Sequence, residues 1–293
     1  MPNSWTIKDL LKVSADYLKE KGTESPRLTA EVLLAHQLNV DRMDLYLDFE
    51  KPLLEKEIDG YRSLIKRRIG HEPLQYITGH KEFWSLEFMV NHHVLIPRPE
   101  SELLVELSLS VLRNPSMNQD RPPRILDLCT GCGAIAVSLA KEIPHAVIWA
   151  TDLFENALDV ARLNAEKNGV CEAITFLHGD LWEPLSNKDV TFDVILSNPP
   201  YVAAEEYDAL PPEVREYEPR HALDGKEGGL HFIRKIIHKA SSFLCHDGWI
   251  IIEMAPNQTG RALELLNQSG EYGKTKSIKD HSRLERIVMA QKA

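Results

Sequence analysis

The sequence predicts an α/β fold with a doubly wound sheet of seven strands, whose last strand is antiparallel, preceded by a small N-terminal helical bundle and a β-hairpin connector. Three observations support this. Apolar residues recur at helical spacing before Gly70, strand and helix patterns alternate after Pro123, and the last two strand patterns lie too close together for a crossover helix. At 293 residues, of which 43% are hydrophobic and 27% charged, the chain is long enough for two domains.

Composition excludes several classes of protein. The longest uncharged apolar run, residues 128–140, is shorter than the roughly 20 residues that a membrane helix needs. Charged residues near the N-terminus leave no signal-peptide core, and four cysteines do not make a disulfide framework. We therefore expect a cytoplasmic protein, a monomer without membrane contact.

The first part of the chain reads as helices followed by a hairpin. Apolar residues such as Leu10, Leu11 and Leu18 recur at helical spacing up to Ile69, which predicts a helical domain over residues 1–72. Aromatic and β-branched residues at 76–77, 83–84 and 88–90 then predict a hairpin connector over residues 73–96.

The remainder, residues 97–293, reads as one α/β domain. A helix over residues 100–112 comes first, and later helices begin near Ala134, Glu155, Leu230 and Asn257. Seven strands are expected between and after these helices: Arg124–Leu128, Ala146–Thr151, Ala173–His178, Val190–Ser197, Trp249–Met254, Thr275–Ile278 and Arg286–Ala290.

The turn after the first of these strands, residues 129–133, is called the cofactor turn below. Gly131, Gly133 and Ala136 satisfy the G-x-G-x-x-G/A pattern, in which a tight turn and a close backbone approach to a nucleotide both exclude a side chain. Alone this signal is weak, because glycine recurs wherever the backbone needs a positive φ.

Acidic residues at three consecutive strand ends strengthen the signal. Asp152 lies 21 residues after Gly131, where it can accept both ribose hydroxyls, and Asp180 beside Leu181 could hold an adenine. A single such acid is more often a helix cap or a solvated group. Asp127 at the cofactor turn would repel a pyrophosphate and attract a sulfonium, so the pocket favours S-adenosylmethionine over NAD.

The fourth strand ends in Asn198-Pro199-Pro200-Tyr201. Two prolines fix the chain and remove two donors, which leaves the Asn198 side chain and the Pro199 carbonyl to accept hydrogen bonds from one NH₂ group. Tyr201 offers a flat face to a planar substrate group. Alternatively, the tetrapeptide only ends the strand, and its polar groups have no role in binding. Against this, open α/β sheets bind ligands at strand ends beside a nucleotide turn.

The remaining sequence features are weaker evidence for function. The long connection over residues 202–229 is read as a substrate-side cover, because loops of this length tend to be functional. Cys129 and Cys132 have zinc or redox spacing but no second pair, so we expect no metal. Without an H-E-x-x-H spacing, His92, His93 and the other histidines are taken as core or solvated groups.

Together these motifs resemble class I S-adenosylmethionine-dependent methyltransferases that act on planar nitrogens. The segments at 79–83, 94–105 and 218–230, with the N-terminal bundle, make the whole chain similar to the peptide chain release factor glutamine methyltransferases. Cys129, Cys132 and Ser101 depart from residues that are usual in that family, and Lys226 interrupts its glycine-rich run.

The resemblance implies methyl transfer to the side-chain amide nitrogen (N5) of the glutamine in the Gly-Gly-Gln motif of class I release factors, with the helical domain selecting the partner. The catalytic residues would be Asn198, Pro199 and Tyr201, and Asn198, Pro199, Pro200 and Tyr201 would bind the glutamine. The cofactor would contact Cys129, Thr130, Gly131, Cys132, Gly133, Asp152, Asp180, Leu181 and Asn198.

Other functions stay open at this point. Residues 81–293 carry −9 of the net charge of −10, which argues against a nucleic-acid base as substrate and leaves a ribosomal-protein glutamine possible. An NAD-dependent oxidoreductase is supported only by the cofactor turn. A non-enzymatic adaptor for release factors is disfavoured by the presence of Asn198 and Asp152.

Overall fold

The computed structural model describes residues 5–114 and 121–293. Residues 1–4 of the expected helical domain and residues 115–120 of the expected α/β domain lie outside the described residues. The chain forms two compact units. The helical unit comprises Met1–Gly79 with Pro212–Tyr217, and the sheet unit comprises His80–Pro211 with Glu218–Ala293.

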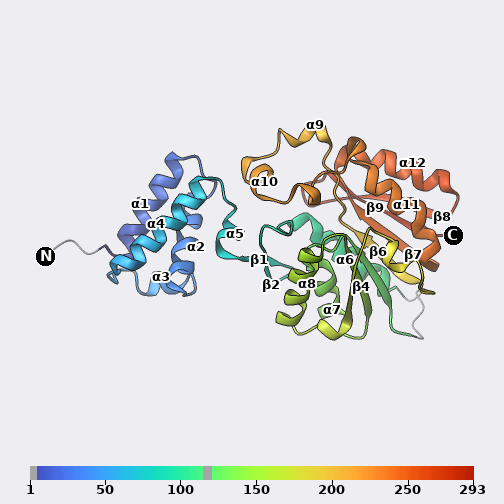
Figure 1. Ribbon diagram of the computed structural model, residues 1–293, viewed down its shortest axis with the longest axis horizontal. Coiled ribbons are helices and arrows are strands. Elements are labelled where there is room, and N and C mark those ends of the chain that lie inside the picture. Colours follow the sequence, from blue (N-terminus) through green and yellow to red (C-terminus); the bar gives the residue numbers. More distant parts are fainter. Residues whose placement is uncertain (1–4, 115–120) are drawn as a thin grey trace. The chain divides into compact units, whose positions relative to one another are not determined.

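The helical unit buries the apolar residues that the sequence places at helical spacing, Leu10, Leu11 and Leu18 among them. Ser25 adopts a left-handed conformation (φ 48°) without a side-chain cap, and Pro26 occupies the first turn of the second helix, where its missing N–H costs nothing. The helices are α1 (Ile7–Glu20), α2 (Pro26–Leu38), α3 (Asp44–Leu47), α4 (Glu55–Ile69) and α5 (Leu74–Thr78) (Figure 1).

A short helix from the 202–229 connection completes this unit. The helix is α10 (Pro212–Tyr217). Its Glu213 forms an ion pair with Arg68 of α4, with 2.8 Å between Glu213 Oε2 and Arg68 Nη2. The Tyr217 hydroxyl donates to the Gly70 carbonyl at 2.5 Å. Part of the connection that was expected to cover the substrate therefore belongs to the helical unit, and its covering role stays a prediction.

The hairpin is shorter than the sequence indicated. Residues 76–77 were expected in a strand, but they lie in α5, which begins after Pro73 and ends at Gly79 with φ at 80°. Proline before a helix and a left-handed glycine after it are stronger local signals than two β-favouring side chains. The hairpin itself is β1 (His80–Phe83) and β2 (Leu86–Met89), joined by Trp84 and Ser85, both at positive φ as a tight hairpin turn requires.

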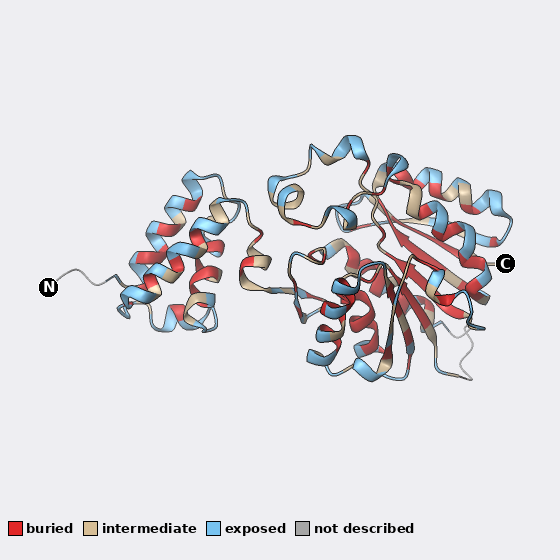
Figure 2. Ribbon diagram, in the orientation of Figure 1, coloured by how far each residue is buried: buried red, intermediate tan, exposed pale blue. Residues whose placement is uncertain are grey.

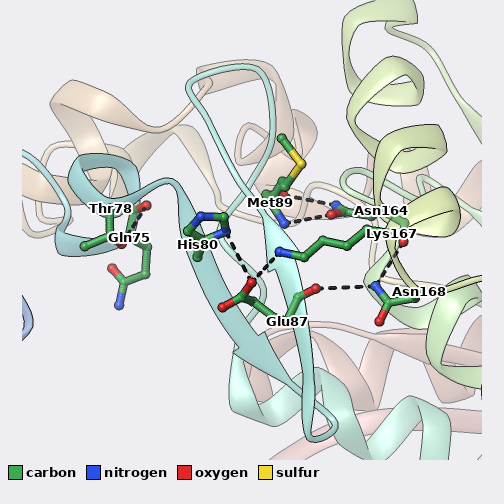
Figure 3. Close-up of polar contacts among 8 residues, drawn as sticks. All are labelled: Gln75, Thr78, His80, Glu87, Met89, Asn164, Lys167 and Asn168. Carbon is green, nitrogen blue, oxygen red and sulfur yellow. Dashed lines mark hydrogen bonds and ion pairs between the residues drawn. The ribbon is translucent and has the colours of Figure 1, made fainter. Parts of the chain in front are cut away.

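The hairpin is anchored on helix α8 (Glu155–Lys167), as Figure 3 shows. The buried Asn164 accepts from the Met89 N–H at 2.7 Å and donates to the Met89 carbonyl at 3.0 Å. Lys167 forms an ion pair with Glu87, whose carbonyl accepts from Asn168 at 3.3 Å. These contacts hold the hairpin against α8.

The sheet confirms the predicted class. Its strand order is β5-β4-β3-β6-β7-β9-β8; the first five strands run parallel, and β9 is antiparallel to both of its neighbours. All residues of the central strand β6 are buried, as expected of a parallel strand covered on both faces (Figure 2). The strands are β3 (Arg124–Leu128), β4 (Val147–Asp152), β5 (Ile174–His178), β6 (Phe192–Ser197), β7 (Leu244–Glu253), β8 (Tyr272–Lys279) and β9 (Glu285–Lys292).

Helices cover both faces of this sheet (Figure 1). One layer contains α6 (Glu102–Leu112), α7 (Ala134–Glu142) and α8, and the other contains α11 (His231–Phe243) and α12 (Thr259–Ser269). The remaining short elements are α9 (Ala204–Tyr207) and the 3₁₀ turns Pro99–Ser101, Cys171–Ala173, Glu183–Leu185, Arg220–Ala222, Glu227–Gly229 and Pro256–Gln258. Within residues 5–114 and 121–293, no helix is both long and apolar enough to span a membrane.

Candidate active site

A single pocket of the sheet unit gathers the motifs found in the sequence. It lies where strands β3, β4, β5 and β6 end, which is where ligands bind in open α/β sheets. Nine expected site residues line it: Cys129, Thr130, Gly131, Cys132, Asp152, Asp180, Leu181, Asn198 and Pro200. Gly133, Pro199 and Tyr201 are not among the lining residues.

The two glycines of the cofactor turn are needed for different reasons. A Cβ on Gly133 would lie 3.0 Å from the Cβ of Ala161 in α8, so this position allows the helices to pack closely. A Cβ on Gly131 would meet nothing within 4 Å, and glycine is favoured there by its φ of 57°. The space in front of Gly131 is therefore open to a ligand.

Asp127 is fully buried in β3, two residues before the cofactor turn begins. Its Oδ2 accepts from the Thr130 hydroxyl at 2.6 Å, and burial raises the pKa of this carboxyl to about 7. Asp127 Oδ1 and Thr151 Oγ1 are buried without a hydrogen-bond partner in the described part of the chain. Of these two residues only Thr151 lines the pocket, so a ligand with a hydrogen-bonding group could satisfy its hydroxyl there.

Asp152 holds the cofactor turn from the end of β4. Its carboxylate accepts from the Gly131 N–H at 2.9 Å and from the Phe154 N–H at 3.0 Å. Burial raises the pKa of Asp152, and those two backbone donors oppose the shift. A carboxylate has about four acceptor positions, so two remain for ligand hydroxyls.

The third acid is more exposed than the first two. Asp180 lines the pocket, and its side chain pairs with Lys235 at 3.2 Å with both groups nearly half exposed. Leu181 next to it is buried at a positive φ of 46° and supplies an apolar wall. This combination suits a flat, partly polar group such as a nucleobase.

The two cysteines of the cofactor turn have little reactivity at neutral pH. Burial raises the pKa of the Cys132 thiol to about 12 and that of Cys129 further still, so neither forms a thiolate. In the described part of the chain, no three His, Cys, Asp or Glu residues are placed to hold a metal ion. Both thiols act as small apolar groups in the pocket wall.

The Asn198–Tyr201 loop leaves β6 with a defined side-chain orientation. The Asn198 amide Nδ2 donates to the Ser101 hydroxyl at 3.0 Å, which leaves Oδ1 as an acceptor. The Tyr201 hydroxyl donates to Glu253 at 3.3 Å, and burial raises the pKa of Tyr201. That Tyr201 offers a flat face to substrate stays a prediction.

The 202–229 connection supports this loop at its far end. A Cβ on Gly229 would lie 2.2 Å from the Tyr201 carbonyl oxygen, and one on Gly225 would lie 2.6 Å from the Tyr201 Cα. The same carbonyl accepts from Gln258 Nε2 at 2.7 Å. The glycines on both sides of Lys226 therefore allow the chain to pass directly against Tyr201.

Several lining residues carried no signal in the sequence. His221, from the 202–229 connection, packs against Phe154 with ring centroids 3.6 Å apart and ring planes tilted by 30°, and both line the pocket. His93 was taken as a core or solvated histidine, but it also lines the pocket, with Phe83 of the hairpin and Phe232 of α11. Phe83 and His221 lie in segments that carry the family resemblance, but no local pattern placed any of these residues at the site; the chain topology brings them there.

Comparisons with known families and structures agree with this architecture. Residues 9–79 match the PrmC N-terminal domain, and residues 106–211 match the methyltransferase small domain. Two solved structures share the fold of the α/β part. They are a human methyltransferase 10 domain containing protein (17% identity, TM-score 0.53, 71% of this chain and 89% of that chain) and a Pyrococcus furiosus methyltransferase (19%, 0.52, 73% and 92%).

Curated relatives match the chain along nearly its whole length. The release factor glutamine methyltransferase of Rhodopirellula baltica is 41% identical over 290 residues, which are 99% of this chain and 97% of the relative. The protein of the same name from Geobacter sulfurreducens is 41% identical over 287 residues, with 98% and 97% covered. From its sheet, its pocket and these relatives, the chain belongs to the release factor glutamine methyltransferase family.

Proposed function

We propose that this protein transfers a methyl group from S-adenosylmethionine to the N5 amide nitrogen of the glutamine in the Gly-Gly-Gln motif of class I peptide chain release factors. The observation that carries the proposal is the Asn198 amide, whose Nδ2 is held by Ser101 so that Oδ1 remains as an acceptor in the pocket. The names of the relatives support this choice of substrate. Release factors act with the ribosome, so we infer a cytoplasmic protein.

The pocket residues fit S-adenosylmethionine. Thr151 Oγ1 lies in the pocket wall, is buried without a partner among the described residues, and would suit a polar group of that molecule. Asp152 keeps lone pairs for ribose hydroxyls, and Asp180 with Leu181 would hold the adenine. When bound, S-adenosylmethionine supplies an activated methyl group on a positively charged sulfur.

Residues at the end of β6 would prepare the acceptor nitrogen. An amide nitrogen is a poor nucleophile because its lone pair is delocalised into the carbonyl. Acceptors at Asn198 and Pro199 would orient the NH₂ group and stabilise the positive charge that develops on nitrogen. The nitrogen gains a methyl group and loses a proton, which can leave after the transfer, so no strong base is needed beforehand. Positioning supplies much of the remaining rate enhancement.

The acidic sheet unit argues against nucleic acid as substrate, because a phosphate backbone is bound by clustered positive charge. A ribosomal-protein glutamine has the same side-chain chemistry. An assay with labelled S-adenosylmethionine therefore offers three acceptors in parallel: unmethylated release factor, unmethylated ribosomal proteins and RNA. We expect label in the release factor alone, and label confined to either other acceptor would contradict the proposal.

The cofactor is tested separately by calorimetry. We expect S-adenosylmethionine to bind and NAD to give no heat. Asp152→Ala should weaken binding by about 1–3 kcal/mol, the range for hydrogen bonds to a charged group. Asp159→Ala is a matched control, because Asp159 is an exposed acid of α8 that pairs only at the surface with Arg162. Equal affinity of the two variants would contradict the role of Asp152.

A further inference from the structure

Glu253, the last residue of β7, is a buried acid that the proposed reaction does not use directly. Its side chain is 1% exposed, and its hydrogen-bond partners are two hydroxyl groups. Ser101 donates to Oε2 at 2.7 Å, and Tyr201 donates to Oε1 at 3.3 Å. A buried carboxylate is costly, and an apolar side chain of similar size would often serve stability as well. This cost points to a role other than packing.

The direction of these hydrogen bonds follows from the chemistry of the groups. An ionised carboxylate only accepts, so the Ser101 hydroxyl must direct its single proton at Glu253. The Ser101 oxygen is then an acceptor toward its other neighbour, and Asn198 donates to it through Nδ2 at 3.0 Å. The Asn198 amide is thereby fixed with its NH₂ toward Ser101 and its Oδ1 away from it. A flipped amide would place two acceptors against each other.

Both ends of the Asn198–Tyr201 loop depend on the same carboxylate. One oxygen of Glu253 reaches Asn198 through Ser101, and the other holds the Tyr201 hydroxyl directly. Ser101 ends the 3₁₀ turn before α6, and Glu253 ends β7, so two separate elements hold the loop; of the two residues, Ser101 also lines the pocket. The loop that would meet substrate is therefore preorganised by Glu253, which is not among the lining residues of the pocket.

We propose that Glu253, acting through Ser101, is a positioning residue that fixes the amide orientation of Asn198 and so presents Oδ1 to the substrate nitrogen. This inference rests on the proposed function, since it assumes that Asn198 accepts a hydrogen bond from the glutamine NH₂. Its energetic effect should appear in the chemical step, because preorganised acceptors act on charge that develops in the transition state. Cofactor affinity should be nearly independent of it.

The test compares single-turnover methylation of release factor at saturating S-adenosylmethionine in four variants of the full-length protein. We expect Ser101→Ala and Glu253→Gln to lower the rate about 10- to 100-fold, less than loss of Asn198 itself. Ser101→Thr keeps the hydroxyl and should restore the rate. Ser108→Ala is the matched control, because this buried serine only donates to the Leu104 carbonyl within α6. Affinity for S-adenosylmethionine should change less than about twofold throughout.

The pH profile gives a second readout. Burial raises the pKa of Glu253 to about 7; Ser101, Tyr201 and Arg286 of β9 oppose this rise, and Glu100 adds to it. Protonated Glu253 no longer accepts from both hydroxyls, so the wild-type rate should fall as pH decreases through about 7. Glu253→Gln cannot titrate and should lack that decrease. The buried Asp127 titrates in the same range, and it is present in both proteins.

The outcomes separate the inference from the proposed function. Wild-type protein that fails to methylate the release-factor glutamine contradicts the proposed function, whatever the variants do. Active wild type with an equally active Ser101→Ala variant overturns the role of Glu253 and Ser101. Loss of S-adenosylmethionine binding in Glu253→Gln would also overturn it, because Glu253 does not line the pocket and the network would then be a general structural support. If the Ser101→Ala variant does not fold, the methylation rate and the pH profile of Glu253→Gln test the inference instead.

Discussion

At the scale of single residues, the reaction depends on which atom of Asn198 faces the substrate. The Nδ2 group is occupied by Ser101, so the acceptor oxygen is the atom available to an incoming NH₂ group. Such an acceptor stabilises positive charge on the substrate nitrogen better as amide resonance is lost. Asn198 should therefore matter more in the transition state than in the bound ground state.

We expect Asn198→Ala to lower the single-turnover rate by about 10²–10³, the range for deleting one preorganised electrostatic partner. Affinity for S-adenosylmethionine should change little. Asn198→Asp keeps an acceptor, but it loses the donor to Ser101 and adds a charge that must be desolvated, so it should also be impaired. Near-normal methylation by the alanine variant would show that the loop has another role.

Residues that directly follow predicted strands were accessible to sequence reasoning, and residues that distant segments bring to the site were not. Gly131, Asp152 and Asn198 could be placed because each follows a strand that its own neighbours predict. Glu253 could not, because its partner Ser101 is 152 residues away and no local pattern links the two. His221 was missed for the same reason, since only folding of the long connection brings it against Phe154.

At the scale of elements, the hairpin contributes to the pocket because α8 holds it in place. Asn164 of α8 joins two parts of the site, since its Nδ2 also donates to the Cys132 carbonyl of the cofactor turn at 2.9 Å. Phe83 at the end of β1 lines the same pocket. The helix, the hairpin and the cofactor turn are thus connected by one buried amide.

We expect Asn164→Ala to lower the free energy of unfolding by about 2–4 kcal/mol, because it removes three hydrogen bonds at a buried position. It should also weaken S-adenosylmethionine binding through the loosened cofactor turn. Lys167→Ala is the matched control on the same helix; it removes only a partly exposed pair with Glu87 and should cost less than about 1 kcal/mol. Urea unfolding and calorimetry measure both effects, and equal losses in the two variants would be inconsistent with this account.

Element type was predictable for long patterns and less so for short ones. The seven strands and their flanking helices follow from runs of apolar residues bounded by turns, and the structure confirms them. Tyr76 and Ile77 look like strand residues by composition, yet Pro73 and Gly79 impose a helical turn on them. In a five-residue segment the end residues outweigh side-chain propensity.

At the scale of the whole molecule, the described lining residues of the pocket all belong to the sheet unit. Cofactor binding and chemistry should therefore need that unit alone. The helical unit is nearly neutral, because residues 1–80 carry a net charge of only −1. We propose that residues 1–72 recognise the protein partner.

Deleting residues 1–72 should leave the affinity for S-adenosylmethionine within about twofold of the full-length value. It should raise KM for intact release factor at least about tenfold and leave KM for a short Gly-Gly-Gln peptide nearly unchanged, because the peptide lacks the surface that the helical unit would contact. Steady-state kinetics with both substrates measures the difference. Equal KM values for intact release factor in the two proteins would contradict partner recognition by this region.

The central claim is that the methyl group goes to the side-chain nitrogen of one glutamine. Unmethylated release factor is incubated with this protein and methyl-labelled S-adenosylmethionine, and tandem mass spectrometry locates the label. Acid hydrolysis of the labelled peptide then identifies the methylated atom, because an N-methylated amide releases methylamine. The account predicts a single methyl group on the Gly-Gly-Gln glutamine and labelled methylamine after hydrolysis. Label on any other residue, or a product that yields no methylamine, would contradict it.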